Sequence, residues 1–361
     1  MRVIALSQDV KILEDGETAR RVSSYGTIAR SFTIVLFSQG ERGEKALAKN
    51  VRILASGGSG KISVFFQGIK VLWNEVKKNP PDLLSVQDPF LIGFAGFLVA
   101  WLRHIPFQAQ VHADCFSHAF RSESFRRFTE SHIARFILKR ASCIRVVSKR
   151  LADSVKSITK APVSILPIRF SPPSESTFAK PAVFSGSFTA LMVSRLTKEK
   201  QVHRIIDAVS KTSEVSLVIV GDGPLKKSLE SRVHSLGIEK RVTFVGWQKD
   251  TSPYYAHADV FLQASLHDGY GLSLIEAASF GLPIVSTNVG IVGDILRVGE
   301  EVLIAEDAPE FSNALKKLME DRQLRVGLAA QAKKRAMEYT LSEEEYLKGY
   351  KEALQTCIAN P

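Results

Sequence analysis

Residues 258–290, ADVFLQASLHDGYGLSLIEAASFGLPIVSTNVG, carry the pattern that decides the fold. The apolar run at 260–262 predicts a buried strand, and a polar loop leads from it into apolar residues at helical spacing. A glycine and a proline end that helix before a second apolar strand begins. Asp268 precedes the helix, and Glu276 lies two turns inside it. The eight-residue spacing would separate the two carboxylates by roughly 12 Å along nearly the same side.

The length and the charge distribution of the chain indicate two domains with different partners. At 361 residues the chain is too long for one ordinary α/β core, so we expect two domains of similar size. Residues 1–180 contain 27 Lys and Arg against 14 Asp and Glu, whereas the remainder contains 21 against 23. The first half therefore carries the positive charge, and we expect it to meet a lipid surface, a phosphorylated acceptor or nucleic acid.

The apolar segments predict a chain that does not span a membrane. The longest apolar run, residues 89–102, is shorter than the roughly 20 residues needed to cross a bilayer and is interpreted as a buried helix. The N-terminus begins a strand and lacks the features of a signal peptide, so we expect a cytoplasmic protein. Cys115, Cys143 and Cys357 are odd in number and widely spaced, which argues against a disulfide framework and against a metal site.

Strand-like runs alternate with helical segments in both halves, which is typical of doubly wound α/β domains with parallel sheets. The expected strands lie at 3–6, 34–37, 51–55, 83–86, 107–111, 143–147, 191–194, 217–220, 242–245, 260–263 and 284–286, and helical segments at about 308–337 and 341–356 end the chain. The expected divisions are an N-terminal acceptor-binding domain at 1–170, a Pro- and Ser-rich linker at 171–187, a C-terminal donor-binding domain at 188–338, and a helix at 339–361 that packs back on the N-terminal domain. Ligands bind at the carboxyl ends of the strands in open α/β sheets, so we expect the site in the cleft between the domains.

Two loops of the second half follow buried strands. GDGPL, residues 221–225, is interpreted as a tight strand-to-helix turn whose glycines serve the backbone, although a nucleotide contact stays open. In SRLTKEK, residues 194–200, Arg195 and Lys200 are either a solvated surface pair or two cations aimed at one anion. Two cations at one place would stabilise the charge that develops on a departing diphosphate.

The segment HDGYGLSLIE, residues 267–276, combines a helix N-terminus with the two carboxylates. Gly269 and Gly271 lead into a helix whose first N–H groups and dipole favour a phosphate. Asp268 could be only a helix cap, and Glu276 only a solvated helix residue. The apolar neighbours of Glu276 nevertheless indicate that its carboxylate needs a partner, and ribose hydroxyls would supply one.

In order and spacing, the motifs SRLTKEK, IVGDGPL, VTFVGW and DGYGLSLIEAASFGLPIVST resemble the donor domain of the family 4 retaining glycosyltransferases of the GT-B fold. The resemblance is strong over residues 185–310 and weaker over QDPFLIGFAG, VHAD and IRVVSKRL in the first half. It implies that Arg195 and Lys200 hold the donor diphosphate, that Glu276 holds the ribose, and that Asp268 lies close to the donor sugar. The backbone of the next residues would lie beside the sugar and phosphate: Gly269, Tyr270, Gly271 and Leu272.

Two features depart from the pattern of that family. Asp268 is one methylene shorter than the usual glutamate, so its reach to the sugar and the donor preference are open. The glycine pair expected after the first strand is absent, and Gly16 is the only glycine there that could let a backbone approach a substrate.

The resemblance also gives a role to a histidine in the first half. A lone histidine is more often structural, but the family places the residue that matches His112 beside the donor sugar and the reacting centre, with Asp114 a weaker neighbour. No Asp-x-Asp or other metal-ligand spacing occurs in the sequence, so we expect neither a metal nor a cofactor.

The segment RSESFRRFTESHIARFILKR, residues 121–140, interleaves cations with apolar residues. As a helix it would bury one apolar stripe and expose a cationic one. That face is either simply solvated or docks on an anionic membrane surface, where each nearby Lys or Arg contributes about 1 kcal/mol. Nucleic acid is disfavoured as a partner because no recognition motif accompanies the charge.

The resemblance implies a retaining enzyme that moves a hexose from a nucleoside diphosphate sugar to a hydroxyl of a glycan or lipid-linked acceptor, a precursor of a glycolipid or polysaccharide. In that mechanism the acceptor attacks from the side of the leaving group, and the departing phosphate accepts the proton. The alternatives are a nucleotide-sugar-binding protein without transfer activity and a GT-B nucleotide-sugar epimerase. We expect a cytoplasmic location, at the inner face of the membrane if the basic face docks there.

Overall fold

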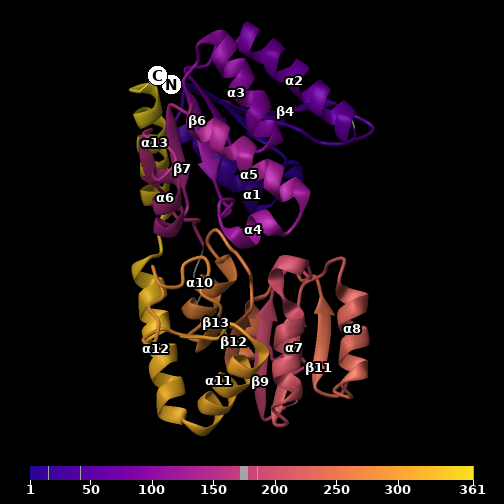
Figure 1. Ribbon diagram of the computed structural model, residues 1–361. Helices are drawn as coiled ribbons and strands as arrows, with labels where there is room; N and C mark the ends of the chain where they lie inside the picture. Colours follow the sequence, from indigo (N-terminus) through magenta and orange to yellow (C-terminus); the bar gives the residue numbers. More distant parts are fainter. Residues whose placement is uncertain (15, 41, 171–177, 185, 361) are drawn as a thin grey trace. The chain divides into compact units, whose positions relative to one another are not determined.

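The chain forms two compact units (Figure 1). The computed structural model describes residues 1–14, 16–40, 42–170, 178–184 and 186–360. The N-terminal unit comprises Met1–Pro167 and Leu341–Pro361, and the C-terminal unit comprises Ile168–Thr340. Each unit is an α/β domain with a largely parallel sheet, which confirms the predicted fold class. Residues 171–177 and 185 of the predicted linker lie outside the described residues, so the linker remains a prediction.

The sheet of the N-terminal unit has the strand order β3-β4-β2-β1-β5-β6-β7-β8. Its strands are β1 Arg2–Ser7, β2 Ser31–Leu36, β3 Gly43–Ala48, β4 Val51–Ala55, β5 Leu83–Val86, β6 Phe107–Val111, β7 Cys143–Val146 and β8 Val163–Ile165. All neighbouring strands are parallel except β3 and β4. The two edge strands β3 and β8 were not predicted, because an edge strand needs no apolar run and β3 is largely polar and exposed.

Helices cover both faces of this sheet. They are α1 Glu17–Ser23, α2 Lys61–Lys78, α3 Leu91–Arg103, α4 His118–Ser122, α5 Phe125–Leu138, α6 Lys149–Lys156 and α13 Glu343–Ile358, with the 3-10 turns η1 Val10–Leu13 and η2 Ser24–Thr27. On one face α3 contacts both α2 and α5. On the other face α1 and α13 share a core with the central strands, so the last helix of the chain belongs to the N-terminal unit.

The apolar run that ends in α3 is not fully buried, contrary to the sequence interpretation. Its inner face packs on the sheet, where a Cβ on Gly96 would collide with Val86 and Leu6. Its outer face is solvent-exposed and apolar, with Trp101 62% and Leu91 54% exposed. Among the described residues no helix is both long and apolar enough to cross a membrane.

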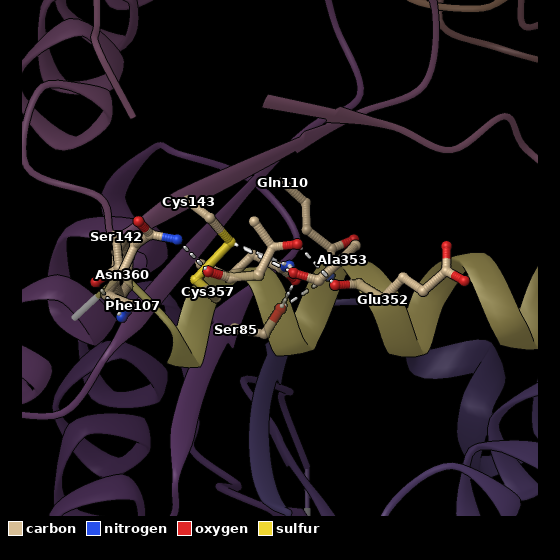
Figure 2. The surroundings of a disulfide bond; sticks show 11 residues. Ser85, Phe107, Gln110, Ser142, Cys143, Glu352, Ala353, Cys357 and Asn360 are labelled. Carbon is tan, nitrogen blue, oxygen red and sulfur yellow. Dashed lines mark hydrogen bonds between the residues drawn. A yellow bond between two sulfur atoms is a disulfide. The ribbon is translucent and has the colours of Figure 1, made fainter. Parts of the chain in front are cut away.

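A disulfide joins Cys143 on β7 to Cys357 near the end of α13, so the argument from cysteine number and spacing against a disulfide framework missed this bond (Figure 2). The two residues lie 214 positions apart, and only the packing of α13 on the sheet brings them together. Gln108 on β6 donates from Nε2 to the carbonyl of Ala353 on the same helix at 3.2 Å. Cys115 is a free, buried cysteine.

The C-terminal unit has a parallel six-stranded sheet with the order β11-β10-β9-β12-β13-β14. Its strands are β9 Phe188–Val193, β10 Val215–Val220, β11 Val242–Gly246, β12 Val260–Gln263, β13 Ile284–Ser286 and β14 Val302–Ile304, the last of which was not predicted. Its helices are α7 Val202–Ser210, α8 Lys226–Ser235, α9 Ser252–His257, α10 Leu272–Ser279, α11 Ala308–Glu320 and α12 Arg322–Glu338, with the 3-10 turn η3 Lys198–Lys200. From β9 the chain adds strands in one direction and from β12 in the other. The topological switch point therefore lies between β9 and β12, and sheets of this kind bind ligands at the carboxyl ends of the strands beside it.

The segment expected to form one helix at about 308–337 is two helices. α11 ends at Glu320, and Asp321 leaves helical geometry with φ −101° and ψ 88°. The Asp321 carboxylate accepts a hydrogen bond from Leu324 N at 2.8 Å and so caps α12. One short capping side chain thus ends one helix and begins the next.

Candidate functional site

Lys200 and Asp268 meet at the switch point of the C-terminal unit. Lys200 ends η3 in the loop after β9, and Asp268 lies in the loop after β12. Because β9 and β12 are adjacent and parallel, both loops leave the same edge of the sheet. Lys200 Nζ donates to Asp268 Oδ2 at 2.6 Å, and the two side chains keep 15% and 19% of their surface exposed. The structure therefore pairs two residues that the sequence assigned separately to the diphosphate and to the sugar.

Arg195 lies in the same loop, and 77% of its side chain is exposed. Its Nη2 lies 3.5 Å from Oε1 of Glu199, four positions later in the chain. The sequence analysis did not predict a role for Glu199. Burial opposes ionisation of Glu199, but hydrogen bonds from Thr197 Oγ1 and its own backbone, with the charges of Arg195 and Lys200, outweigh burial and lower its pKa. Glu199 is thus a buried anion that holds the cationic loop together.

The GDGPL turn supports the same loop, as the structural interpretation of its glycines predicts. Gly221 has φ +132°, and a Cβ there would collide with the carbonyl oxygen of Ser194. A Cβ on Gly223 would lie 2.5 Å from the Leu196 carbonyl oxygen. Leu196 N donates to the Asp222 carbonyl at 2.9 Å. The two glycines therefore let the backbone pack directly against the loop that carries Arg195.

The turn into α10 depends on Gly271. This residue precedes the helix in the left-handed conformation, with φ +82° and ψ 61°. A Cβ there would also lie 2.8 Å from Leu274 Cδ1. α10 then begins at Leu272, so the positive end of its dipole lies at the loop that carries Asp268 and Gly269.

Tyr270 takes a structural place in this loop. The residue is 2% exposed, and its carbonyl oxygen accepts a hydrogen bond from Ile291 N at 2.9 Å. Between the end of β12 and the start of α10, three buried polar atoms make no hydrogen bond with the described part of the protein: Gln263 Nε2, Ser265 Oγ and Tyr270 OH. Leaving such a group unsatisfied costs about 1–3 kcal/mol, so Gln263 and Ser265 are candidate ligand contacts that the sequence did not indicate.

Glu276 has a protein partner that the sequence did not predict. Tyr255 on α9 donates its hydroxyl hydrogen bond to Glu276 Oε2 at 2.8 Å. The Tyr255 ring is 1% exposed and stacks on Phe280 with centroids 5.4 Å apart. Burial and the Glu276 charge raise the pKa of Tyr255 well above its usual value, so the phenol keeps its proton and remains a donor. Tyr255 thereby orients the carboxylate expected to bind the ribose.

His112 lies in the N-terminal unit, directly after β6. Its Nε2 is 3.3 Å from Gln110 Oε1, and the same oxygen accepts from Arg145 Nη1 at 2.8 Å. Gln110 Nε2 donates to Ser85 Oγ at 2.9 Å. These contacts fix the amide orientation, so Nε2 of the histidine must donate to Gln110 and Nδ1 keeps its lone pair in the neutral ring. Burial and the positive charges of Arg145 and Arg21 lower the pKa of His112, which favours the neutral form, although part of the residue's surface is exposed to solvent.

Arg145 is the unexpected member of this group. It is 4% exposed and stands in the middle of the otherwise apolar strand β7. Nη2 donates to Tyr346 OH at 3.2 Å, and the guanidinium carbon lies 5.1 Å from the ring centroid of Tyr350. Both tyrosines are on α13, so the last helix of the chain supports His112 through Arg145 and Gln110. An arginine inside an apolar strand was the sequence signal that could have indicated a buried functional role for Arg145.

Asp114 and Gly16 have simpler surroundings. The Asp114 carbonyl accepts from Ser117 Oγ at 3.0 Å in the turn that leads to α4. Gly16 precedes α1 with an extended backbone, and a Cβ on it would meet nothing within 4 Å. Packing therefore does not require a glycine at position 16, and its substrate role remains a prediction. The described residues contain no group of three or more His, Cys, Asp or Glu side chains that could hold a metal ion.

Two family models match the chain: Glycosyltransferase Family 4 over residues 26–167 and Glycosyl transferases group 1 over residues 173–335. The lipopolysaccharide core biosynthesis glycosyltransferase LpsE of Rhizobium meliloti is 35% identical over 141 residues, which cover 38% of this chain and 42% of that protein. The chain thus matches less than half the length of LpsE.

Two further proteins are similar over more of their length. The lipopolysaccharide 1,6-galactosyltransferase of Salmonella typhimurium is 26% identical over 70% of this chain and 69% of that protein. The crystal structure of Anabaena HepE in complex with UDP aligns with a TM-score of 0.76 at 19% identity, over 99% of this chain and 100% of that chain. The latter similarity establishes a shared fold.

Proposed function

The chain belongs to the family 4-like glycosyltransferases and has their GT-B fold, and from this we propose that it is a retaining hexosyltransferase that uses a nucleoside diphosphate sugar. The observation that carries the proposal is the Lys200–Asp268 pair at the switch point, beside the N-terminus of α10. A cation, a carboxylate and a positive helix end together match a diphosphate joined to a sugar. Because HepE binds UDP, UDP-hexoses are the first donors to test.

The proposed reaction needs no covalent intermediate on the protein. An acceptor hydroxyl forms a bond to the anomeric carbon while the bond from that carbon to the phosphate oxygen breaks. The electron pair of the broken bond goes to the phosphate, which also takes the acceptor proton. Lys200 and Arg195 stabilise the charge on the diphosphate, and Asp268 positions the sugar hydroxyls. The resemblance assigns His112 to the sugar, and its contact with Gln110 leaves Nδ1 of the neutral ring able to accept a hydrogen bond from a hydroxyl.

The acceptor is proposed to be an envelope glycolipid or a polysaccharide precursor. LpsE and the Salmonella enzyme carry lipopolysaccharide in their names, and the first half of this chain carries the excess of positive charge. A lipid-linked acceptor would require contact with a membrane surface, and we propose peripheral association at its inner face.

A second candidate function is nucleotide-sugar binding without transfer. The observation that favours it is that Lys200 already donates a hydrogen bond to Asp268, whose side chain is one methylene shorter than the glutamate that the resemblance leads us to expect there. Tight donor binding without UDP release across a panel of acceptors would support this candidate and exclude the transferase.

Lys200→Ala tests the proposal directly. It should abolish sugar transfer without unfolding the protein, because it removes the proposed diphosphate contact while the Asp268 side chain that it leaves behind keeps 19% of its surface exposed to water. Lys211→Ala, at an exposed position after α7, is the matched control and should transfer normally. Normal turnover by Lys200→Ala would exclude the assignment of the diphosphate site.

A further inference from the structure

The solvent face of α3 is entirely apolar up to its last residue. Positions with spacings of three and four bring the exposed side chains onto one face: Leu91, Phe94, Leu98, Trp101 and Leu102. No charged residue occurs in the helix before Arg103. A surface helix normally turns polar residues to water, so a wholly apolar outer face indicates that something other than water covers it.

Neighbouring helices extend this apolar face. α3 contacts α2 and α5, and Figure 1 shows the three helices beside one another in the N-terminal unit. The rings of Phe94 and Phe136 lie 6.1 Å apart, and Arg103 of α3 lies over the ring of Trp73 of α2 at 5.7 Å. The exposed apolar residues of the two flanking helices are Ile62, Phe66, Trp73, Phe125, Phe128 and Phe136. We call these residues, with the exposed face of α3, the α3 surface.

Cations, and not carboxylates, accompany the α3 surface. The exposed ones on the three helices and at the end of α5 are Lys61, Lys70, Lys77, Lys78, Arg103, Arg126, Arg135, Lys139 and Arg140. The carboxylates within α2, α3 and α5 are Glu75 and Glu130, which are buried and ion-paired to Arg52 at 2.6 Å and to Arg126 at 2.8 Å. The surface thus presents aromatic and aliphatic groups among positive charges.

We propose that the α3 surface docks on an anionic lipid bilayer. Apolar side chains would enter the boundary between headgroups and acyl chains, and the tryptophans suit that boundary because their rings are amphipathic. The Lys and Arg side chains would meet lipid phosphates. A second copy of the chain fits less well, because two such surfaces would bring like charges together.

A cavity beside this surface gives the docking a use. It has a volume of about 680 Å³ and shares Leu91 with the α3 surface, and Lys61 and Arg126, two of the cations that accompany this surface, also line it. Phe37, Phe65 and Phe90 give it apolar walls. A docked chain would hold this cavity at headgroup level, where the head of an amphiphilic acceptor could enter. The acceptor part rests on the proposed function, whereas the docking does not.

Vesicle flotation with the purified full chain tests the docking. Vesicles of phosphatidylcholine with phosphatidylglycerol should capture the chain, and pure phosphatidylcholine vesicles should capture far less. The double variant Leu98→Ser/Trp101→Ser should lower capture at least tenfold, and Trp101→Ser alone should lower it severalfold. Trp247→Ser is the matched control, because this tryptophan is 65% exposed in the C-terminal unit. Lys139→Gln/Arg140→Gln should weaken capture by about fivefold per charge and reduce its salt dependence.

The outcomes separate docking from its alternatives. Failure of anionic vesicles to capture the wild-type chain, or equal capture of a folded Trp101→Ser variant, would overturn the proposal. A dimer detected by light scattering that the double variant dissociates, without vesicle capture, would identify the surface as a self-association face and also overturn it. The vesicles contain no sugar donor or acceptor, so none of these results depends on transfer activity.

Discussion

The Lys200–Asp268 pair leads to a prediction for Asp268→Asn in which UDP affinity and the rate of sugar transfer change in opposite directions. In the free protein the carboxylate neutralises the cation that is proposed to hold the diphosphate. Asp268→Asn removes a negative charge that would repel the donor phosphates and also frees Lys200 to face them. The variant should therefore bind UDP more tightly than the wild type, yet it should transfer sugar more slowly because the contact to the sugar weakens.

The expected magnitude follows from the geometry of the pair. With Nζ 2.6 Å from Oδ2, a phosphate oxygen on the other side of Nζ would lie about 5 Å from the carboxylate. Repulsion between unit charges at that separation is about 0.8 kcal/mol in water and about 3 kcal/mol at an effective dielectric constant of 20. Because the two side chains keep 15% and 19% of their surface exposed, water screens the repulsion only in part, and we expect a gain of at least about 1 kcal/mol, or a Kd at least fivefold lower.

Isothermal titration of UDP into wild type and Asp268→Asn measures this difference. The gain in affinity should shrink at high salt, because screening weakens the repulsion that the substitution removes. Glu230→Gln removes one exposed carboxylate from α8 and should leave the Kd unchanged, which controls for net charge. Equal or weaker UDP binding by Asp268→Asn would refute the inference that Asp268 and the diphosphate share Lys200.

Three further predictions concern the supports of the site. Tyr255→Phe removes the donor to Glu276 and should raise the KM for the donor by roughly fivefold to twentyfold, measured by steady-state kinetics; an unchanged KM would show that Tyr255 does not orient Glu276 for the ribose. Gly271→Ala forces a side chain into a left-handed conformation and should cost about 1–3 kcal/mol in urea unfolding and abolish UDP binding; full binding would contradict the assigned turn. Cys357→Ser should lower stability by about 2–5 kcal/mol in urea without reductant, and reductant should destabilise only the wild type; equal response of both proteins would show that the bond to Cys143 contributes nothing.

The parts of the fold set by local periodicity could be predicted from the sequence. The apolar run at 260–262 lies in β12, and the helix predicted after the following loop is α10. Both were predictable because buried parallel strands and amphipathic helices leave strong repeating patterns in the sequence. The edge strands β3, β8 and β14 left no such pattern. The two helices that meet at Asp321 were predicted as one helix, because a single aspartate is a weak boundary signal when the residues on both sides are good helix formers.

The candidate site was predictable where the chemistry is local and not where it depends on contacts between distant segments. Lys200 and Asp268 each carried a recognisable motif, but their contact depends on the adjacency of β9 and β12. Tyr255 acts on Glu276 from another helix, 21 positions earlier. The disulfide between Cys143 and Cys357 depends on how α13 packs on the sheet. The sequence did not predict it, because three cysteines include one that stays free, and an odd number argues against a disulfide framework.

The exposed face of α3 shows that an apolar run in the sequence does not reveal what covers it. A short apolar run predicts burial equally well whether protein or lipid covers it, because both remove the same side chains from water. The structure adds that Leu98 and Trp101 lie exposed on the outer side of the helix, so the rest of the described chain does not cover them. The sequence interpretation of a cationic membrane face centred on residues 121–140, whereas the structure centres the apolar surface on α3.

The central claim is that this chain transfers a hexose from a nucleoside diphosphate sugar bound at the switch point of the C-terminal unit. Nuclear magnetic resonance of the purified chain with a UDP-hexose panel and a lipopolysaccharide-derived acceptor tests it most directly. We expect release of UDP with one donor, a glycoside whose anomeric configuration is that of the donor, and loss of both signals in Lys200→Ala. An inverted product would contradict the retaining mechanism, and full release of UDP by Lys200→Ala would contradict the assigned site.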